Sequence, residues 1–317
     1  MELQCIAKEI KSLEIKLSGF ITSEIKLATE VASYLIDSGG KRIRPILCIL
    51  TGKAVGYEKD DLITLACAIE LLHTASLIHD DVVDNSEIRR GKKSIHKKWD
   101  NAHSVLVGDF VYSKAFQLMA LIGNKEVITS LSNSTNRISE GEILQLTMVE
   151  KEINQKEYFE IIGRKTAELF KASVKCAALL SEASDNQLKS ISQFGFSLGI
   201  AFQLKDDLLD YFGHQSETGK KLGKDFEEGK LTLPLIKTLE LSSEKDAKFI
   251  RTSLKEKKIE NFEEVRSIME NSGAIEEIKN EINKYSLSCL SGLKILSTSP
   301  YQETLKEIVI DLDKRKV

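Results

Sequence analysis

The sequence predicts a single all-α domain. Apolar residues recur at three- and four-residue spacing through most of the chain, which is the period of amphipathic helices. Proline is scarce, with 3 in 317 residues against an average share of about 5%. No series of alternating apolar and polar segments lines up as the strands of a sheet.

The first half of the chain is expected to contain four helices, over residues 3–36, 45–53, 60–84 and 102–121. The first of them is closed by Gly39 and Gly40, which suit a helix stop or a loop that approaches a ligand closely. The third is apolar on most sides, as expected for a helix surrounded by other helices. The polar residues 91–99 are expected to form a loop.

The second half is expected to contain helices over residues 125–149, 155–183, 185–212 and 231–241. A loop rich in glycine and charge, 213–229, separates the last two. Residues 241–317 are more charged and should form amphipathic helices at 263–270, 275–296 and 302–314. No low-complexity linker divides the chain, so one domain over residues 1–317 is expected.

Composition excludes several classes of protein. The net charge of −3 leaves no basic excess to indicate a nucleic-acid partner. The five cysteines are scattered without a CxxC pair, which favours reduced thiols in a cytoplasmic protein over a zinc site or a disulfide framework. The start of the chain lacks the apolar region of a signal peptide. The longest apolar run, 62–78, contains Glu70 and His73, which favours a core helix over a transmembrane segment.

Two of the expected helices end in the pattern Asp-Asp-x-x-Asp, at residues 80–84 and 206–210. The outer carboxylates of each motif lie one helical turn apart on one face, near enough to bind one hard cation. Carboxylate oxygens without a histidine or cysteine partner favour Mg²⁺ that keeps several waters. Either motif alone is equally compatible with a helix that ends in solvent. Two copies, each followed by basic residues, favour a metal site that also binds phosphate groups.

Basic residues accompany both motifs. The segment GGKRIRP at 39–45 joins flexible backbone to three cations, and Arg89-Arg90-Gly91 follows the first motif. His73 lies on the face of the first motif and Gln203 on the face of the second. One isolated cation would be read as a surface charge, and a lone histidine as a core residue. Together with the aspartates, these residues indicate a cavity that binds metal and diphosphate.

Seven segments, in this order, resemble those of the trans-isoprenyl diphosphate synthases. They are GGKRIRP at 39–45, HTASLIHDDVVDNSEIRRG at 73–91, VLVGDF at 105–110, SEGEILQL at 139–146, GRKTAELF at 163–170, FQLKDDLLDYFG at 202–213 and GKDFEEGKLTLPL at 223–235. The resemblance covers roughly residues 35–240, with all catalytic motifs within 39–235. Within the family, the sequences of these segments most resemble those of the bacterial long-chain polyprenyl synthases, especially the octaprenyl diphosphate synthases.

The resemblance implies a helical bundle of the isoprenoid synthase type, in which the two aspartate motifs face a central active-site cavity. It implies that Mg²⁺, or Mn²⁺ in vitro, binds to Asp80, Asp84 and Asp206. The remaining aspartates of the motifs would support the same catalytic centre: Asp81, Asp207 and Asp210. In the implied reaction, metal and cations neutralise the leaving diphosphate, the allylic bond ionises, and the double bond of isopentenyl diphosphate attacks the carbocation.

The resemblance also assigns the substrate contacts. The allylic diphosphate would bind to Arg89, Lys165, Gln203 and Lys220, with Lys230 nearby. Isopentenyl diphosphate would bind to Lys41, Arg44, His73 and Arg90. Lys165 would lie at the catalytic centre, where the hydroxyl of Thr166 would steady the reacting region.

A long product is expected, because the residues four and five positions before Asp80 are the small Ser76 and Ala75. In this family a bulky aromatic residue near there closes the pocket early and gives short products. We therefore expect octaprenyl diphosphate for quinone side chains, with farnesyl diphosphate as the primer. The family and the largely apolar run 104–121 favour a homodimer, and an apolar product implies transient membrane contact at its release.

Other functions stay open at this point. A shorter geranylgeranyl product would need the same motifs. A terpene cyclase, which is a lyase, would need only one Asp-Asp-x-x-Asp motif and would lack the second-substrate segment GGKRIRP. A catalytically silent partner subunit would be expected to have lost aspartates or arginines that this chain retains. A non-enzymatic helical metal binder would leave the basic segments unexplained.

Overall fold

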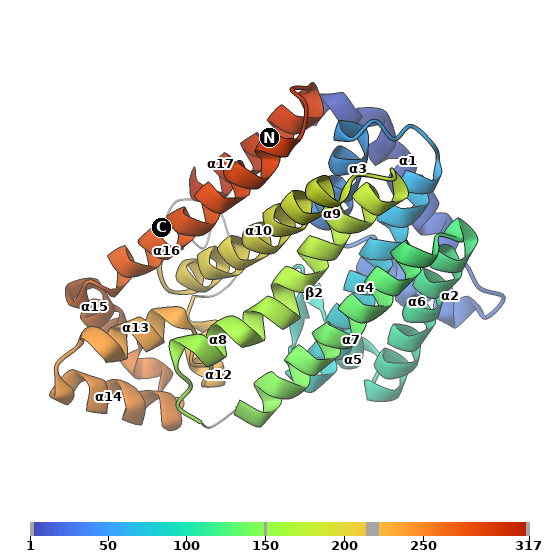
Figure 1. Ribbon diagram of the computed structural model, residues 1–317. Coiled ribbons are helices and arrows are strands. Elements are labelled where there is room, and N and C mark those ends of the chain that lie inside the picture. The colour runs from blue at the N-terminus through green and yellow to red at the C-terminus, as the bar shows by residue number, and fades with distance from the viewer. Residues whose placement is uncertain (1–2, 149–150, 214–221, 315–317) are drawn as a thin grey trace. The chain divides into compact units, whose positions relative to one another are not determined.

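The computed structural model describes residues 3–148, 151–213 and 222–314, which are almost entirely helical, as predicted (Figure 1). The chain divides into two compact units. Unit 1 is formed by Met1–Thr135, Ala172–Ser192 and Lys294–Leu305, and unit 2 by Asn136–Lys171, Gln193–Leu293 and Lys306–Val317. Four α-helices and the short helix η4 (Leu293–Ile295) contribute residues to both units; the four are α7 (Lys125–Met148), α9 (Glu168–Leu180), α10 (Asp185–Phe212) and α17 (Pro300–Lys314).

Unit 1 is built around one buried helix, α4. Its further elements are η1 (Gln4–Ile6), α1 (Ala7–Phe20), α2 (Lys26–Ile36), α3 (Ile43–Ala54), α4 (Asp61–Val83), β1 (Ile88–Arg89), β2 (Lys92–Lys93), α5 (Ile95–Lys98) and α6 (Asn101–Ile122). Helix α4 packs against α1, α3 and α6 (Figure 1). A Cβ atom on Gly52 of α3 would lie 2.5 Å from Leu62 of α4, so glycine permits this close packing.

Two described helices, α4 and α6, are long and apolar enough to cross a membrane by composition alone. The apolar part of α4 is 78% buried within the chain, which confirms the prediction of a core helix. The apolar part of α6 is only 33% buried, so much of this helix presents apolar side chains outward.

The prediction of one helix over residues 3–36 is wrong, because the chain breaks between α1 and α2. The hydroxyl of Thr22 donates to the carbonyl of Gly19 at 2.9 Å, and the hydroxyl of Ser23 accepts from the backbone of Ile25 at 3.1 Å. Such short polar side chains offer the backbone an alternative to helical hydrogen bonds. The predicted loop 91–99 likewise contains the strand β2 and the single turn α5.

Unit 2 has two apolar clusters. Its further elements are α8 (Gln155–Ile162), η2 (Gly163–Ala167), α12 (Lys224–Glu228), α13 (Leu233–Leu241), α14 (Glu244–Lys255), η3 (Ile259–Asn261), α15 (Phe262–Ser272) and α16 (Ala274–Gly292). One cluster joins α8, α10, α13 and α16, and the other gathers around Tyr211, Phe226 and Phe262. Helix α13 packs against α14, α15 and α16 (Figure 1). The predicted helix 155–183 is interrupted by the π-helical turn η2.

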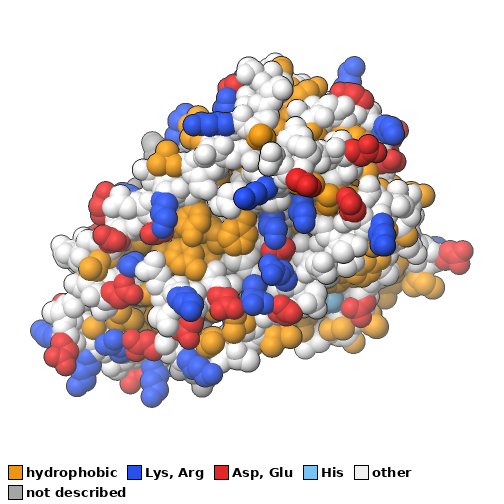
Figure 2. Space-filling view, viewed as in Figure 1, with side chains coloured by type: hydrophobic (Ala, Val, Ile, Leu, Met, Phe, Trp, Pro, Cys, Tyr) orange, Lys and Arg blue, Asp and Glu red, His pale blue; other side chains and the backbone are white. Residues whose placement is uncertain are grey.

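Acidic and basic side chains are interspersed over the face of the molecule seen in Figure 2. All five cysteines lie within the described residues, and none of them forms a disulfide. Burial raises the pKa of the Cys67 thiol to about 12, so this thiol stays protonated at neutral pH.

Candidate functional site

Two backbone turns in unit 1 bring predicted substrate residues together. Helix α2 is followed by Gly39 (φ 74°) and Gly40 (φ 144°), which adopt backbone conformations that favour glycine. Strands β1 and β2 pair through Arg90 (φ 52°) and Gly91 (φ 74°), the two left-handed residues of a tight hairpin turn. A Cβ atom on Gly40 would lie 3.0 Å from Cζ of Arg90, so Gly40 leaves room for that guanidinium.

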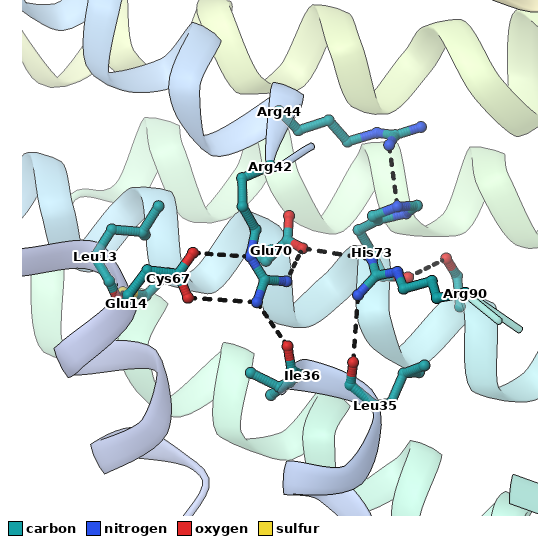
Figure 3. A network of polar contacts seen from close by, with 11 residues as sticks. Leu13, Glu14, Leu35, Ile36, Arg42, Arg44, Cys67, Glu70, His73 and Arg90 are labelled. Carbon is teal, nitrogen blue, oxygen red and sulfur yellow. Dashed lines mark hydrogen bonds and ion pairs between the residues drawn. The ribbon is translucent and has the colours of Figure 1, made fainter. Parts of the chain in front are cut away.

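Arg44 of α3 donates from Nη1 to Nε2 of His73 on α4 at 3.1 Å (Figure 3). Because a guanidinium can only donate, Nε2 accepts and the ring proton belongs on Nδ1. Burial lowers the pKa of His73 well below 6.5, and the charges of Arg44 and Arg90 lower it further. His73 is therefore neutral at physiological pH. Together, these side chains form a cationic group suited to a diphosphate.

The three carboxylates of the first aspartate motif differ in burial and in hydrogen-bond partners. Asp81 is 3% exposed, and its Oδ1 accepts from Nε and Nη2 of Arg89 at 2.9 and 2.5 Å. Asp80 and Asp84 are partly exposed, and the backbone hydrogen bond between them places them one helical turn apart. Burial alone would lower the pKa of Arg89, but all three aspartates raise it. The carboxylates and Arg89 thus form one electrostatic group.

In unit 2, Lys165 and Thr166 lie on the π-helical turn η2. Single π turns inside helices often mark functional sites. A Cβ atom on Gly141 would lie 2.8 Å from the backbone nitrogen of Lys165, and one on Gly199 would lie 2.5 Å from Cα of Ala167. Two glycines, from α7 and α10, therefore let this turn pack closely against both helices. The ammonium of Lys165 donates to side chains of α7, Glu142 and Gln145, at 2.7 Å each.

The second aspartate motif contains a buried hydrogen-bond chain. Thr166 Oγ1 donates to Gln203 Oε1 at 2.8 Å, and Gln203 Nε2 donates to Asp207 Oδ1 at 2.7 Å. The hydroxyl of Tyr158 donates to the other oxygen of Asp207. Burial raises the pKa of Asp207 to about 7, while these two hydrogen bonds act in the opposite direction. Tyr158 and Gln203 thus fix the side chain of Asp207 from two elements.

Asp210 ends this motif and anchors the backbone that follows the second gap in the described residues. Its carboxylate accepts from the backbone nitrogens of Lys224 at 3.2 Å and Asp225 at 3.0 Å, and its carbonyl accepts from Gly223 at 2.8 Å. Asp206 is partly exposed on α10. The three aspartates of this motif therefore also differ in their surroundings.

The donor chemistry of these residues fits a hard divalent cation. Asp80, Asp84 and Asp206 supply carboxylate oxygens from partly exposed side chains, which are the ligands that Mg²⁺ and Ca²⁺ prefer. Within residues 3–148, 151–213 and 222–314, no three His, Cys, Asp or Glu side chains are arranged to hold a metal ion. At either motif, water and substrate oxygens would have to complete the coordination of an ion.

The remaining predicted residues have varied surroundings. Lys41 is exposed, and Lys230 forms an ion pair with Glu228 at 2.8 Å. Lys220 lies outside the described residues. Ala75 is fully buried on α4, and Ser76 Oγ donates to the carbonyl of His73 at 2.9 Å.

Sequence reasoning missed the side chains that hold the functional ones. These are Glu70, Glu142, Gln145 and Tyr158. A signal existed for Glu70, because a charged residue in an apolar helix requires a partner when it is buried. No comparable signal marked Tyr158, whose partner Asp207 is 49 positions away.

Comparisons with known proteins agree with this geometry. The family model described as polyprenyl synthetase matches residues 25–272. The chain is 37% identical over 301 residues to the octaprenyl diphosphate synthase of Escherichia coli, covering 94% of this chain and 93% of the relative. It is 36% identical over 293 residues to a short chain isoprenyl diphosphate synthase of Methanothermobacter thermautotrophicus, with 91% and 90% covered.

The fold is also that of a solved polyprenyl synthase. The crystal structure from Caulobacter crescentus, complexed with calcium and isoprenyl diphosphate, matches with a TM-score of 0.94 and 33% identity. The match covers 99% of this chain and 97% of the other. The bundle is therefore of the isoprenyl diphosphate synthase type, as the sequence predicted.

Proposed function

Because the chain belongs to the polyprenyl synthetase family, we propose that it extends farnesyl diphosphate with isopentenyl diphosphate to all-trans octaprenyl diphosphate. The chain is a prenyltransferase of the long-chain type. The identity to octaprenyl diphosphate synthases supports the octaprenyl product, although relatives with shorter products are nearly as similar. A product of that length would serve as a quinone side chain, and residues 1–317 would act as one catalytic domain.

The observation that carries this proposal is the cationic group of Arg44, neutral His73 and Arg90 in unit 1. A terpene cyclase acts on one diphosphate and has no need of it, whereas a synthase must bind isopentenyl diphosphate as a second substrate. Lys41 extends from the same segment and would complete this subsite. The geometry of these residues thus favours elongation over cyclisation.

The allylic diphosphate would be held by the other cations. Arg89, fixed by Asp81, and Lys165, fixed by Glu142 and Gln145, have donors oriented by carboxylate and amide oxygens. Lys220, Lys230 and Gln203 would contribute further contacts, and Thr166 would act through Gln203. Positioned cations of this kind stabilise the charge that develops on a leaving diphosphate.

The divalent metal would be Mg²⁺, which Asp80 and Asp84 would bind in unit 1 and which Asp206 would bind, separately, in unit 2. When bound, the ion neutralises charge on the allylic diphosphate and so assists its departure. Mn²⁺ would substitute in vitro, since it accepts the same oxygen ligands. Asp207 and Asp210 would support this centre by fixing side chains and backbone around Asp206.

We also propose that the protein is a homodimer in the cytoplasm. Helix α6 exposes Val105, Leu106, Phe116 and Leu121 at 43–73%. Asp109 and Lys114 interrupt the same helix, and charges in the middle of a span are costly in lipid. The exposed apolar face of α6 is therefore better suited to contact a second copy of the chain than to contact lipid. Membrane contact would be transient and limited to product release.

The test is an elongation assay. Purified protein is incubated with labelled isopentenyl diphosphate, farnesyl diphosphate and Mg²⁺, with and without excess chelator, and the dephosphorylated products are separated by length. A metal-dependent ladder that ends at octaprenyl diphosphate supports the whole proposal. A ladder that ends at geranylgeranyl diphosphate would support the elongation reaction and reject octaprenyl diphosphate as the product. A cyclic hydrocarbon would show a cyclase, and no turnover would show a silent subunit.

A further inference from the structure

Glu70 is a buried carboxylate at the centre of a cationic network (Figure 3). It lies on α4, one helical turn before His73, and only 2% of it is exposed. Its Oε1 accepts from Nη1 of Arg42 at 2.7 Å and lies 3.9 Å from Nη2 of Arg90. A single carboxylate oxygen therefore faces two guanidinium groups.

Arg42 donates hydrogen bonds to the protein from each of its three guanidinium nitrogens. Its Nε donates to Glu14 at 3.1 Å, its Nη1 donates to Glu70, and its Nη2 donates to the carbonyl of Ile36 at 2.8 Å. Its backbone is left-handed, with φ 46°, so the turn into α3 directs it differently from Arg44. All three guanidinium nitrogens of Arg42 thus donate to the protein itself.

Arg90 is held more loosely. Its Nη1 donates to the carbonyl of Leu35 at 3.3 Å, and its other contact is the longer ion pair with Glu70. The pKa of Arg90 is lowered by burial, raised by Glu70, and lowered again by Arg42. The carboxylate therefore offsets the repulsion between two neighbouring arginines.

We propose that Glu70 is a positioning residue that holds Arg90 beside Arg44 and His73 before isopentenyl diphosphate binds. It does so by accepting from Arg42 and attracting Arg90 at one oxygen, so that three arginines can gather without a bound anion. The inference rests on the proposed function, because it assigns Arg90 to the subsite for isopentenyl diphosphate. A pre-arranged subsite binds its ligand without having to assemble its cations at that moment.

A merely structural ion pair makes a different prediction. If Glu70 only neutralised Arg42, its loss would lower the stability of the fold and leave substrate binding unchanged in the protein that remains folded. If Glu70 positions Arg90, its loss must weaken the binding of isopentenyl diphosphate and spare the allylic substrate. The split between the two substrates distinguishes these roles.

The test compares Glu70→Gln with the matched variant Glu14→Gln. Both remove a carboxylate that binds Arg42, but Glu14 acts on Arg90 only as a weaker charge than Glu70, and its side chain is 47% exposed. In the full-length protein, Glu70→Gln should raise the KM for isopentenyl diphosphate about tenfold, since a charge-assisted contact orients Arg90. In the same variant, the KM for farnesyl diphosphate and kcat should change less than about twofold. In Glu14→Gln, both KM values and kcat should stay within about twofold of the wild type.

A second variant keeps the test decisive if Glu70→Gln does not fold. Arg42→Gln combined with Glu70→Gln removes both buried charges, so that neither is left unpaired. The KM for isopentenyl diphosphate should stay raised about fivefold in the double variant, because Arg90 still lacks its carboxylate. Calorimetric titration with isopentenyl diphosphate alone, and with inorganic diphosphate, measures binding without turnover. It should show a loss of affinity in both variants.

The outcomes separate the two proposals. Wild-type elongation with an unchanged KM for isopentenyl diphosphate in both variants rejects the role of Glu70 and leaves the synthase activity intact. An equal loss of affinity for both substrates would also reject the positioning of Arg90, because the effect would not be specific to isopentenyl diphosphate. Absence of elongation and of isopentenyl diphosphate binding by the wild type would reject the proposed function itself.

Discussion

Arg89 donates two hydrogen bonds to a single oxygen of Asp81, from Nε at 2.9 Å and from Nη2 at 2.5 Å. Asp81 is buried, so its carboxylate faces the hairpin, whereas Asp80 and Asp84 remain partly exposed. The middle aspartate of the first motif therefore orients a cation, whereas the outer two are the ones proposed to bind metal.

Asp81→Asn should weaken the binding of the allylic substrate more than the binding of the metal. Loss of the carboxylate leaves Arg89 without its charged partner, which is worth about 1.5–3 kcal/mol, so the KM for farnesyl diphosphate should rise about tenfold or more. The Mg²⁺ concentration for half-maximal activity should change less than about twofold, while Asp80→Asn should raise it strongly. If Asp81→Asn raised the Mg²⁺ concentration for half-maximal activity as much as Asp80→Asn, Asp81 would instead be a metal ligand.

Tyr158→Phe should destabilise unit 2. The substitution removes the hydroxyl that donates to buried Asp207 and leaves Gln203 as its donor, which should cost about 1–3 kcal/mol in the free energy of unfolding. Denaturant unfolding measures this loss, with Tyr285→Phe as a control on a partly exposed ring that packs against Phe159. A change as small as that of the control would show that Gln203 alone satisfies Asp207.

His73 should make stability fall as the pH falls. Its pKa in the folded protein lies well below 6.5, mainly because of burial and then because of Arg44 and Arg90. Below pH 6.5 the unfolded chain binds a proton that the folded chain does not, so stability declines until the pH reaches the folded pKa. This contribution is at most about 1.4 kcal/mol per pH unit.

His73→Asn and His73→Gln should both flatten the pH dependence of unfolding below pH 6.5. Denaturant unfolding at a series of pH values measures the slopes. An unchanged slope in both variants would place the proton uptake on other groups.

The sequence predicted the parts of this structure that repeat with a short period. Apolar spacing over residues 60–84 identified α4, and the four-residue spacing of Asp80 and Asp84 placed both on one face. The break after Phe20 was missed, because apolar periodicity continues across it while local hydroxyl contacts of Thr22 end the helix.

Contacts between distant segments could not be predicted in this way. The hydrogen bond from Tyr158 to Asp207 depends on how α8 packs against α10, which no local pattern encodes. The π turn around Lys165 depends on two glycines from other helices. The candidate site residues were predicted from their chemistry, whereas the residues that contact them follow from packing.

Ser76→Phe should shorten the product. Ser76 is partly buried on α4, one turn before Asp80, so a phenyl ring there would narrow a product tunnel that follows this helix. The elongation ladder should end earlier than in the wild type, while the rate of the first condensation falls less than about threefold. Ser18→Phe is the matched control, because Ser18 is an exposed helical serine whose hydroxyl also bonds to a backbone carbonyl. The same ladder in both variants would mean that the tunnel avoids this position.

Leu106→Glu and Leu121→Glu should convert a dimer into a monomer. Both side chains lie on α6 and are 67% and 73% exposed in the single chain. If a second copy covers this helix, each substitution buries a carboxylate without a partner in the interface, which costs several kcal/mol. Sedimentation velocity should then show about half the wild-type mass.

The control for this experiment is Ile15→Glu on α1, an isoleucine that is 65% exposed. It adds the same charge at a comparable exposure and should leave the mass unchanged. Because the substitutions on α6 lie at exposed positions, circular dichroism should show an intact helical fold in all three variants. A wild-type monomer, or dimers that survive both substitutions on α6, would assign its apolar face to another partner, and vesicle co-sedimentation would then test whether that partner is lipid.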